Sequence, residues 1–307
     1  MTTEIKLPEV EQAAEQAVEQ AEKQVGESLW SKAIYKFRRD RAGMIGLSVV
    51  ALYMLVAIGV WLGLWGTEWS DNNGPKWAGA SAEYWFGTNI IGQDIYARAI
   101  FSTKTAFEVG LVVAVLSTVI GAIFGAISGF FSNSWIDEVV LWVMGVLDSI
   151  PFYLFVAAIA FALSGFAYSM HVAMIATFWT TTSRLVRGEV IKLKNFEFVE
   201  AAHAVGVPQG TIIFRHILPN TFHILLVQST IVFVGAIKSE VILSFLGLGV
   251  KDGVSWGLMI SESTIEVQAG HFANFYAASA LLFVLVMAFN MFSDSLQDAL
   301  DPRKVSS

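Results

Sequence analysis

The sequence predicts an all-α membrane protein with six transmembrane helices. Residues of the set AVILMFWYC make up 55% of the 307 positions and only 15% are charged, more apolar surface than a soluble domain of this length can bury. Six largely apolar stretches are each long enough to cross about 30 Å of hydrocarbon. The 23 Phe and 10 Trp suit lipid-facing surfaces and interfacial aromatic belts.

Composition also excludes several classes of function. The formal net charge of -7 gives no support to nucleic-acid binding. The absence of cysteine excludes disulfides and thiolate chemistry but leaves the compartment open. The five histidines show no HExxH or other ligand spacing, so we expect no metal site. We also expect no cleavable signal peptide, because the chain starts with an acidic stretch.

Residues 1–29 form an acidic extension that we expect to be a frayed helix or disordered, outside the membrane. Ala, Glu and Gln dominate it between Glu9 and Gln24, and Ala buries too little area for a stable helix face. A cytoplasmic docking helix is the alternative. Residues 30–43 set Trp30, Ile34 and Phe37 among basic residues, which is typical of an interfacial amphipathic helix on the anionic inner leaflet.

The predicted transmembrane domain, residues 44–300, contains the six spans, and a cytoplasmic tail, 301–307, follows it. The spans cover about 44–65, 106–130, 136–163, 170–186, 222–246 and 275–292. The third is broken near Asp148 and Pro151. A polar loop, 66–105, follows the first span. A second long loop, 248–274, carries Trp256, Glu262 and Glu266 and suits an external gate, a receptor-docking surface or interfacial packing.

Basic residues orient these spans. They cluster before the first span, between the fourth and fifth, and after the sixth: Lys32, Lys36, Arg38, Arg39, Arg41, Arg184, Arg187, Lys192, Lys194, Arg215, Arg303 and Lys304. The opposite side has only Lys76, Arg98, Lys104 and Lys251. Both termini and the loop between the fourth and fifth spans are therefore predicted to be cytoplasmic.

A stripe of glycines runs along one face of the second span. Gly121, Gly125 and Gly129 recur at every fourth position, a spacing that lets another helix approach closely in lipid. The spacing does not say whether this neighbour belongs to the same chain or to a partner.

The cytoplasmic loop, about 187–220, is predicted to fold into two short helices joined by a tight turn. Gly206 can take positive φ and end the first helix, Pro208 suits the first turn of the second, and Pro219 is expected to break it before the fifth span. A low, smooth surface that fits a groove on another protein is expected at Ala201 and Ala202. The sequence has no Gly-Lys dipeptide, so the phosphate-binding motif GxxxxGK[ST] is absent and this loop is not a nucleotide site.

Glu200-Ala201-Ala202, followed by Gly206 and Ile217-Leu218-Pro219, resembles the EAA coupling motif of bacterial ABC importer permeases. The segment Phe86-Gly87-Thr88-Asn89-Ile90-Ile91-Gly92-Gln93-Asp94 resembles the FGTDxxGRDxxSR signature of their dipeptide/oligopeptide C-type subfamily. The chain departs from that signature at Asn89, Gln93 and Ala97. Further segments similar to the subfamily are Leu243–Gly249, Ser255–Gly257 and Ala299–Arg303.

The resemblance implies the type I importer permease fold and a place in the bacterial cytoplasmic (inner) membrane. It implies a heterodimer with a homologous B-type permease, two ATP-binding subunits that carry ATP and Mg²⁺, and an extracytoplasmic solute-binding protein. This chain would need no cofactor of its own and would contact membrane lipid. The implied ATPase-coupling residues are Glu200, Ala201, Ala202, Gly206, Pro208, Ile217 and Pro219. Short peptides are the favoured cargo, with oligosaccharides or nickel as alternatives.

Three ionisable residues fall within the predicted spans: Asp148, Lys238 and Glu240. Such groups usually face a cavity or a partner. Lys238 and Glu240 point in different directions on a helix, so a direct ion pair between them is not expected. The resemblance covers Asp148 and Glu240 but not Lys238. Substrate contact in the pathway and pairing between helices or subunits both remain open for these residues.

Two other classes of function compete with the importer. An ion-coupled secondary transporter would share the intramembrane charges and the broken third span, but it predicts an inverted repeat that the two halves do not show. A membrane-embedded enzyme would need a catalytic constellation, and none occurs at useful spacing. We therefore expect a transport subunit and not an enzyme.

Overall fold

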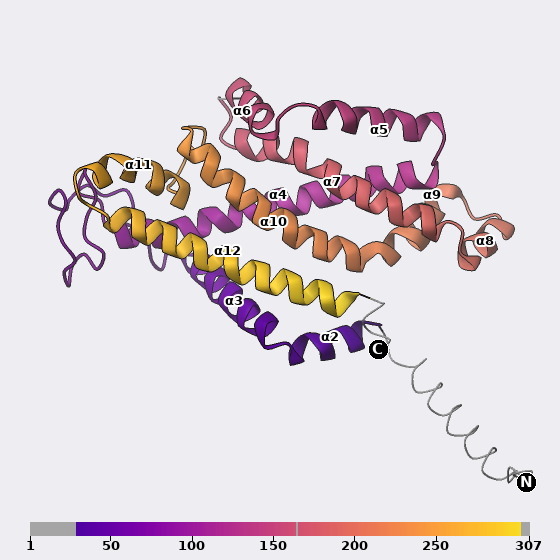
Figure 1. Ribbon diagram of the computed structural model, residues 1–307, viewed down its shortest axis with the longest axis horizontal. Helices are drawn as coiled ribbons and strands as arrows, with labels where there is room; N and C mark the ends of the chain where they lie inside the picture. The colour runs from indigo at the N-terminus through magenta and orange to yellow at the C-terminus, as the bar shows by residue number, and fades with distance from the viewer. Residues whose placement is uncertain (1–28, 164, 302–307) are drawn as a thin grey trace, which may run out of the picture.

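The structure is a computed structural model that describes residues 29–163 and 165–301, and within these ranges it contains helices and no strand. The helices lie roughly along one long axis, which makes the molecule elongated (Figure 1). The predictions for the acidic extension fall on residues outside the described ranges, except at Leu29. The predictions for the cytoplasmic tail also fall outside the described ranges, except at Asp301.

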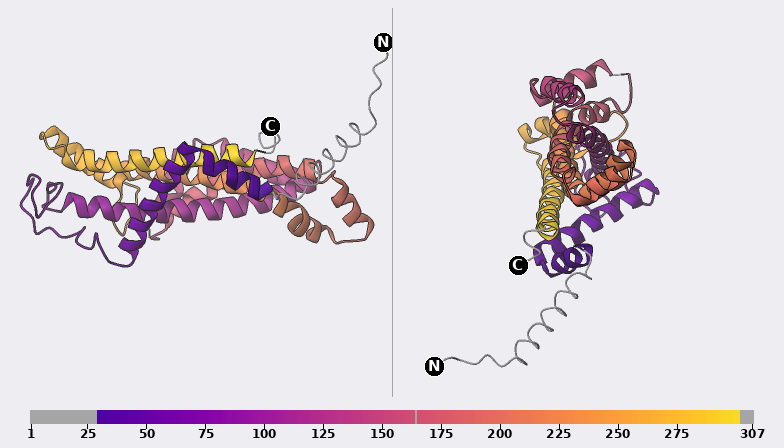
Figure 2. Two further views of the ribbon diagram at one scale, coloured as in Figure 1. Left: turned by 90° about the horizontal axis from the view of Figure 1, so that it is seen from below. Right: turned by 90° about the vertical axis from the view of Figure 1, so that its right-hand side faces the viewer.

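The chain forms twelve labelled segments of helix and one short π-helix in the described ranges. They are α2 (Leu29–Arg39), α3 (Arg41–Trp61), α4 (Ile95–Phe130), α5 (Trp135–Asp148), α6 (Phe152–Ala162), α7 (Ser169–Leu193), α8 (Glu197–Ala204), α9 (Gln209–Thr211), the π-helix (Ile212–Ile217), a 3₁₀-helix (Leu218–Thr221), α10 (Phe222–Phe245), α11 (Trp256–Gln268) and α12 (Ala273–Leu300). Different elements lie at the two ends of the molecule. Helix α11 and the loop after α3 lie at one end, and α8 lies at the other (Figure 2). We call these the α11 end and the α8 end.

Four helices of the described ranges are long and apolar enough to cross a membrane, and a bent pair makes a fifth candidate. The four are α3, α4, the continuous helix Gln209–Phe245 and α12. The bent pair is α5 and α6, which meet at 91° around the predicted break at Asp148 and Pro151. Six spans were predicted. The missing one is α7, which has 25 residues but interrupts its apolar sequence with Thr180, Thr181, Thr182, Ser183 and Arg184.

Two aspartates set helix starts that differ from the prediction. Asp94 caps α4 by accepting a hydrogen bond from the Tyr96 N–H at 2.9 Å, so this helix begins at Ile95 and not near residue 106. Asp40 caps α3 in the same way from the Ala42 N–H at 3.0 Å. The two caps therefore lengthen α4 towards the α11 end and separate α2 from the first span.

Pro219 does not break the helix as predicted. It lies in the first turn of the 3₁₀-helix, where a missing N–H costs little. The π-helix before it and the 3₁₀-helix that contains it change the hydrogen-bond register without a loop. The chain consequently runs as one helix from Gln209 to Phe245.

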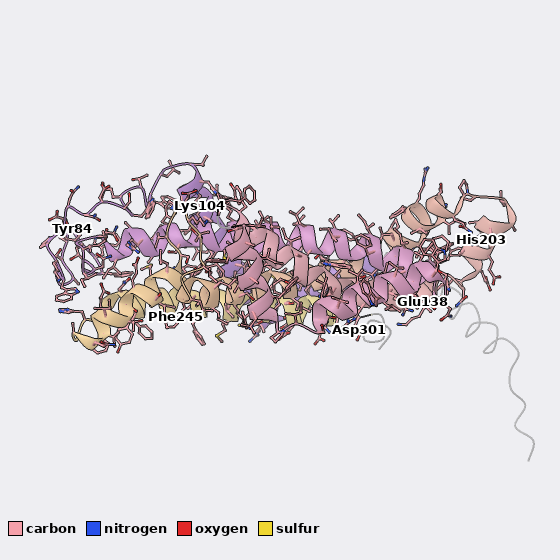
Figure 3. All side chains as sticks on the ribbon, turned by 90° about the horizontal axis from the view of Figure 1, so that it is seen from above. Tyr84, Lys104, Glu138, His203, Phe245 and Asp301 are labelled. Carbon is pink, nitrogen blue, oxygen red and sulfur yellow. The ribbon has the colours of Figure 1, made fainter. Side chains whose placement is uncertain are left out.

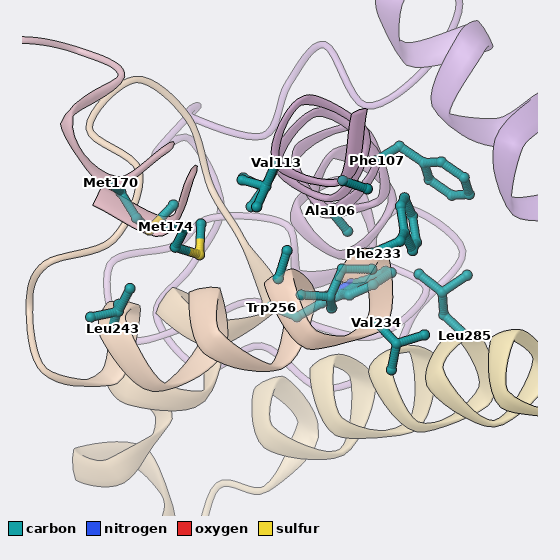
Figure 4. Packing of buried hydrophobic residues seen from close by; sticks show 14 of the residues in the cluster. Ala106, Phe107, Val113, Met170, Met174, Phe233, Val234, Leu243, Trp256 and Leu285 are labelled. Atoms are coloured by element: carbon teal, nitrogen blue, oxygen red, sulfur yellow. The ribbon is translucent and has the colours of Figure 1, made fainter. Parts of the chain in front are cut away.

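Aromatic and aliphatic side chains form the main core, with the largest shares from α4 and α10 and others from α3, α6, α7, α11 and α12 (Figure 4). The rings of Phe233 and Phe289 stack with centroids 4.1 Å apart, and Phe107 is fully buried beside them. Trp256 anchors α11 to this core by donating its indole N–H to the Ala99 carbonyl at 3.0 Å. The core therefore ties α11 to the membrane helices.

The glycine stripe of α4 packs against α7 of the same chain. A Cβ at Gly121 would lie 2.6 Å from the Thr182 Cβ, and one at Gly125 would lie 2.5 Å from the Ser183 carbonyl oxygen. At Gly129 the nearest atom would be the Arg187 carbonyl oxygen, 2.7 Å away. Such distances leave no room for a side chain, so the stripe sets how closely α4 and α7 pack.

Candidate functional site

The loop that carries the predicted coupling residues projects at the α8 end, beyond the long helices (Figures 1 and 2). Helix α8 ends at Ala204, and Gly206 then reverses the chain with φ +82°. This left-handed conformation costs other residues about 1–2 kcal/mol. Pro208 caps the next helix with its extended backbone. The tight turn at Gly206 is therefore present, followed by a helix of mixed type.

The outer surface of this projection is partly apolar. Glu200 and Ala201 are exposed on α8. Val205, which no sequence motif singles out, is 84% exposed at the tip. Phe198 adds a second exposed apolar side chain.

The inner surface of the projection is anchored to α4 and α7. Val199, Ile212 and Ile217 are fully buried in a cluster that also contains the side chains of Ala122, Ala126, Val186 and Val190. His203 lies against Phe130, with ring centroids 6.0 Å apart. The base of the projection is therefore packed onto α4 and α7.

The predicted coupling residues consequently divide into two groups. Glu200, Ala201, Gly206 and Pro208 are exposed and available to a partner. Ile217 is buried and Ala202 is half-buried against the inner cluster, so both attach the projection to the protein. Pro219 is exposed and lines a groove between α4 and α10. Sequence order alone does not separate these roles, because the burial depends on where α4 and α7 end.

Ion pairs fasten the helices near the α8 end and at the break in the α5–α6 pair. Arg187 of α7 donates two hydrogen bonds to Asp137 of α5, both 2.7 Å long. Asp148, at the end of α5, pairs with Arg184 of α7 and accepts a hydrogen bond from the Thr180 hydroxyl at 3.1 Å. Asp148 also lines a cavity of about 390 Å³ at the break.

Lys238 and Glu240 on α10 have different surroundings. Glu240 is 4% exposed and accepts a hydrogen bond from Ser244 inside the protein. Lys238 is exposed, and among the residues that the structure describes it has no hydrogen-bond or ion-pair partner. The two side chains therefore do not pair with each other.

At the α11 end, a polar cluster joins the loop before α4 to α11. The Asn89 amide donates to the Gln93 side-chain oxygen at 2.9 Å, and Arg98 donates to the same oxygen and to Glu262. Glu266 of α11, 1% exposed, accepts the Ile90 N–H at 2.7 Å. We call these six residues the α11 clasp: Asn89, Ile90, Gln93, Arg98, Glu262 and Glu266.

The charge of the α11 clasp is affected by burial. Burial raises the pKa of Glu262 above its ordinary value, and Glu266 adds to the rise while Arg98 opposes it. The family signature has Asp and Arg where this chain has Asn89 and Gln93. Two hydrogen-bonded amides thus replace an acid and a base at these positions. Within the described ranges no group of three or more His, Cys, Asp or Glu side chains has metal-binding geometry.

The projection at the α8 end and the α11 clasp lie at opposite ends of the apolar helices, and His203 and Tyr84 mark the two ends in Figure 3. Comparison with known proteins identifies a family of membrane transport components. The family model described as "Binding-protein-dependent transport system inner membrane component" matches residues 117–306.

Curated relatives match nearly the whole chain. A dipeptide transport system permease protein of Alkalihalophilus pseudofirmus is 32% identical over 281 residues, 91% of each chain. An oligopeptide transport system permease protein of Bacillus subtilis is 33% identical over 279 residues, 90% of each chain. A glutathione transport system permease protein of Escherichia coli is 33% identical over 282 residues, 89% of this chain and 90% of the relative.

Proposed function

The chain belongs to the inner membrane components of binding-protein-dependent transport systems, within the dipeptide/oligopeptide ABC permeases, and from this membership we propose that it imports short peptides using ATP hydrolysed by separate subunits. We also propose an orientation in the membrane, in which the α8 end faces the cytoplasm and the α11 end faces outward. The cluster of basic residues near the α8 end supports this orientation.

The observation that carries the proposal is the projection at the α8 end. Its tip is exposed and partly apolar at Val205, while its base is buried against α4 and α7. A motor subunit that moved this tip would shift both helices at once. We propose that ATP-driven closure of two ATP-binding subunits draws the projections of two permeases together and moves the spans between inward-open and outward-open states.

The partners follow from the same membership. We propose a homologous B-type permease as the second half of the pathway, two ATP-binding subunits that hold ATP and Mg²⁺, and a solute-binding protein that delivers cargo to the α11 end. The Glu200 carboxylate, exposed on α8, would meet a basic or polar group on the rim of the ATP-binding subunit. The bacterial cytoplasmic membrane would contain the complex.

Peptides are the cargo we propose, because the relatives described above are named for dipeptides, oligopeptides and glutathione. Oligosaccharides or nickel are the other cargoes that a transporter of this architecture would carry. Uptake of peptides and of short oligosaccharides by the reconstituted complex separates these cargoes directly. Peptide uptake supports the proposal, and oligosaccharide uptake alone would replace it.

Replacing Gly206 tests the coupling role. Gly206→Val forces a β-branched residue into φ +82° and should distort the turn. We expect ATP-driven uptake and cargo-stimulated ATP hydrolysis to fall together by about tenfold or more. Gly188→Val is the matched control, since a Cβ at Gly188 meets no atom within 4 Å and its backbone is helical. Transport and stimulated hydrolysis that both survive Gly206→Val would refute docking at this turn.

A further inference from the structure

We propose that Lys238 lies on the wall of the translocation pathway and binds a carboxylate of the cargo, so that the permease itself favours peptides with a free carboxylate. This inference rests on the proposed function, because it requires peptide cargo. It concerns selection within the membrane, separate from any selection by the solute-binding protein.

The first argument is that Lys238 has no partner within the described ranges while three carboxylates of the spans do. Asp137 is bound by Arg187, Asp148 by Arg184, and Glu240 accepts from Ser244. Glu108 of α4 does not face Lys238. Helix α4 packs on the side of α10 that carries Phe233, and this side lies about 140° around the helix from Lys238. An unpaired cation in a span is costly unless it meets water or an anion.

The second argument is the depth and direction of the side chain. Lys238 lies seven residues before the end of α10 at Phe245, which is about 10 Å of helix. Side chains on a helix incline towards its N-terminus, and the N-terminus of α10 is at the α8 end (Figure 1). The Lys238 stem therefore starts out pointing away from the nearer surface, which works against snorkelling to that surface.

The third argument concerns the surroundings of the face of α10 on which Lys238 lies. One turn before it, a Cβ at Gly235 would lie 3.2 Å from the Phe178 ring of α7. Phe178 also lines the cavity at the α5–α6 break, together with Asp148 and Thr181. The polar cavity at the break and Lys238 thus lie close to the same point of the α7–α10 contact.

The same face of α10 continues towards the α8 end into a second cavity, of about 510 Å³. Val227 and Ile231 line it from α10. Its polar lining residues are Glu189, Lys192, His223, Gln228, Gln297 and Asp301. The opposite side of α10 instead borders a groove of about 520 Å³ whose only side chains with polar groups are Thr118 and Ser229. Polar groups therefore border the Lys238 face of α10 near the α8 end, whereas the groove on the opposite side is almost wholly apolar.

The face is better suited to a moving cargo than to a tightly packed helix. Close helix contacts in this chain use small residues, as the glycine stripe of α4 does. The Lys238 face instead exposes the bulky side chains Ile231, Ile242 and Phe245. A lysine offers a mobile point charge with three donors, which matches a carboxylate that arrives and leaves.

The test uses the complete transporter in vesicles, with the solute-binding protein saturated in turn by a tripeptide and by its C-terminally amidated form. ATP-driven uptake of both is compared for the native chain, Lys238→Met, Lys238→Arg and the control Lys32→Met, which removes a lysine of α2. We expect the native chain to import the free acid faster. Lys238→Met should slow uptake of the free acid about tenfold, because one charge-assisted hydrogen bond is lost. It should also bring the ratio of acid uptake to amide uptake close to one. Lys238→Arg and Lys32→Met should keep the ratio.

Three results would overturn the inference. The first is a Lys238→Met variant that keeps the native acid-to-amide ratio, and the second is a native chain that imports the two forms equally. Loss of the partner permease from purified Lys238→Met complex, restored by Lys238→Arg, would assign Lys238 to subunit pairing instead. If the native transporter imports neither peptide but does import another solute, the proposed peptide function has failed, and this is visible before any variant is compared.

Discussion

At the scale of single residues, the α11 clasp shows how this chain differs from the signature it resembles. Gln93 accepts hydrogen bonds from both Asn89 and Arg98, so one neutral oxygen serves two donors. An arginine at position 93 would turn a donor towards Arg98. The neutral amides thus fit the neighbouring Arg98, which keeps Glu262 as its only ion-pair partner in the described ranges.

A double-mutant cycle tests this arrangement. Gln93→Arg alone removes the acceptor for Arg98 and places two cations together, so we expect it to destabilise the protein by about 2 kcal/mol. Adding Asn89→Asp should restore at least half of that loss, because the new carboxylate pairs with the new guanidinium. The thermal stability of the purified complex gives both values. Strictly additive effects would show that positions 89 and 93 do not interact.

The raised pKa of Glu262 predicts a pH dependence at the α11 end. The pKa of Glu262 in the folded protein lies above the ordinary value of 4.5. The contribution of protonated Glu262 to stability is therefore complete below pH 4.5, and it is lost as the pH rises through the folded pKa. Hydrogen-exchange protection of the amides around Ile90 should therefore fall as the pH rises above 4.5 and through the higher pKa of folded Glu262.

Glu262→Gln should remove most of this dependence. Some pH dependence should remain, because burial also raises the pKa of Asp94 and this shift likewise lowers stability as the pH rises. Protection that rises with pH in the native protein, or a slope unchanged by Glu262→Gln, would contradict the assignment.

At the scale of elements, the close packing of α4 on α7 is the feature most sensitive to mutation. Gly125→Ala would place a Cβ 2.5 Å from a backbone oxygen of α7, and we expect a loss of about 1–3 kcal/mol. Gly145→Ala in α5 is the control, since no atom lies within 4 Å of its new Cβ. Thermal unfolding of both variants in detergent gives the comparison. Equal stability would mean that α4 and α7 do not pack this closely.

The sequence patterns predicted helices better than their ends and neighbours. The break at Asp148 and Pro151 follows from proline chemistry and is present. The glycine spacing predicted a close contact but not its partner, because spacing along one helix says nothing about which helix lies opposite. Pro219 was expected to end a helix, and a change to π and 3₁₀ geometry accommodates it.

At the scale of the whole molecule, the two ends differ in structure and are joined by long helices. The α11 end holds the polar clasp and the α8 end holds the projection, and α4 reaches from one to the other (Figure 1). The tight turn of the projection at Gly206 was predictable from the sequence. Val205 and the anchoring role of Ile217 were not, because exposure depends on tertiary packing against α4 and α7.

The absence of cysteine makes it possible to test directly whether the projection meets a motor subunit. A single cysteine at Val205, 84% exposed, is treated with a short bifunctional reagent in the assembled complex. Ala82→Cys, exposed in the loop at the α11 end, is the matched control. We expect position 205 to cross-link to the ATP-binding subunit and position 82 not to. A cross-link from position 205 to the solute-binding protein, or an ATP-binding subunit joined only to position 82, would refute docking of the motor on the projection.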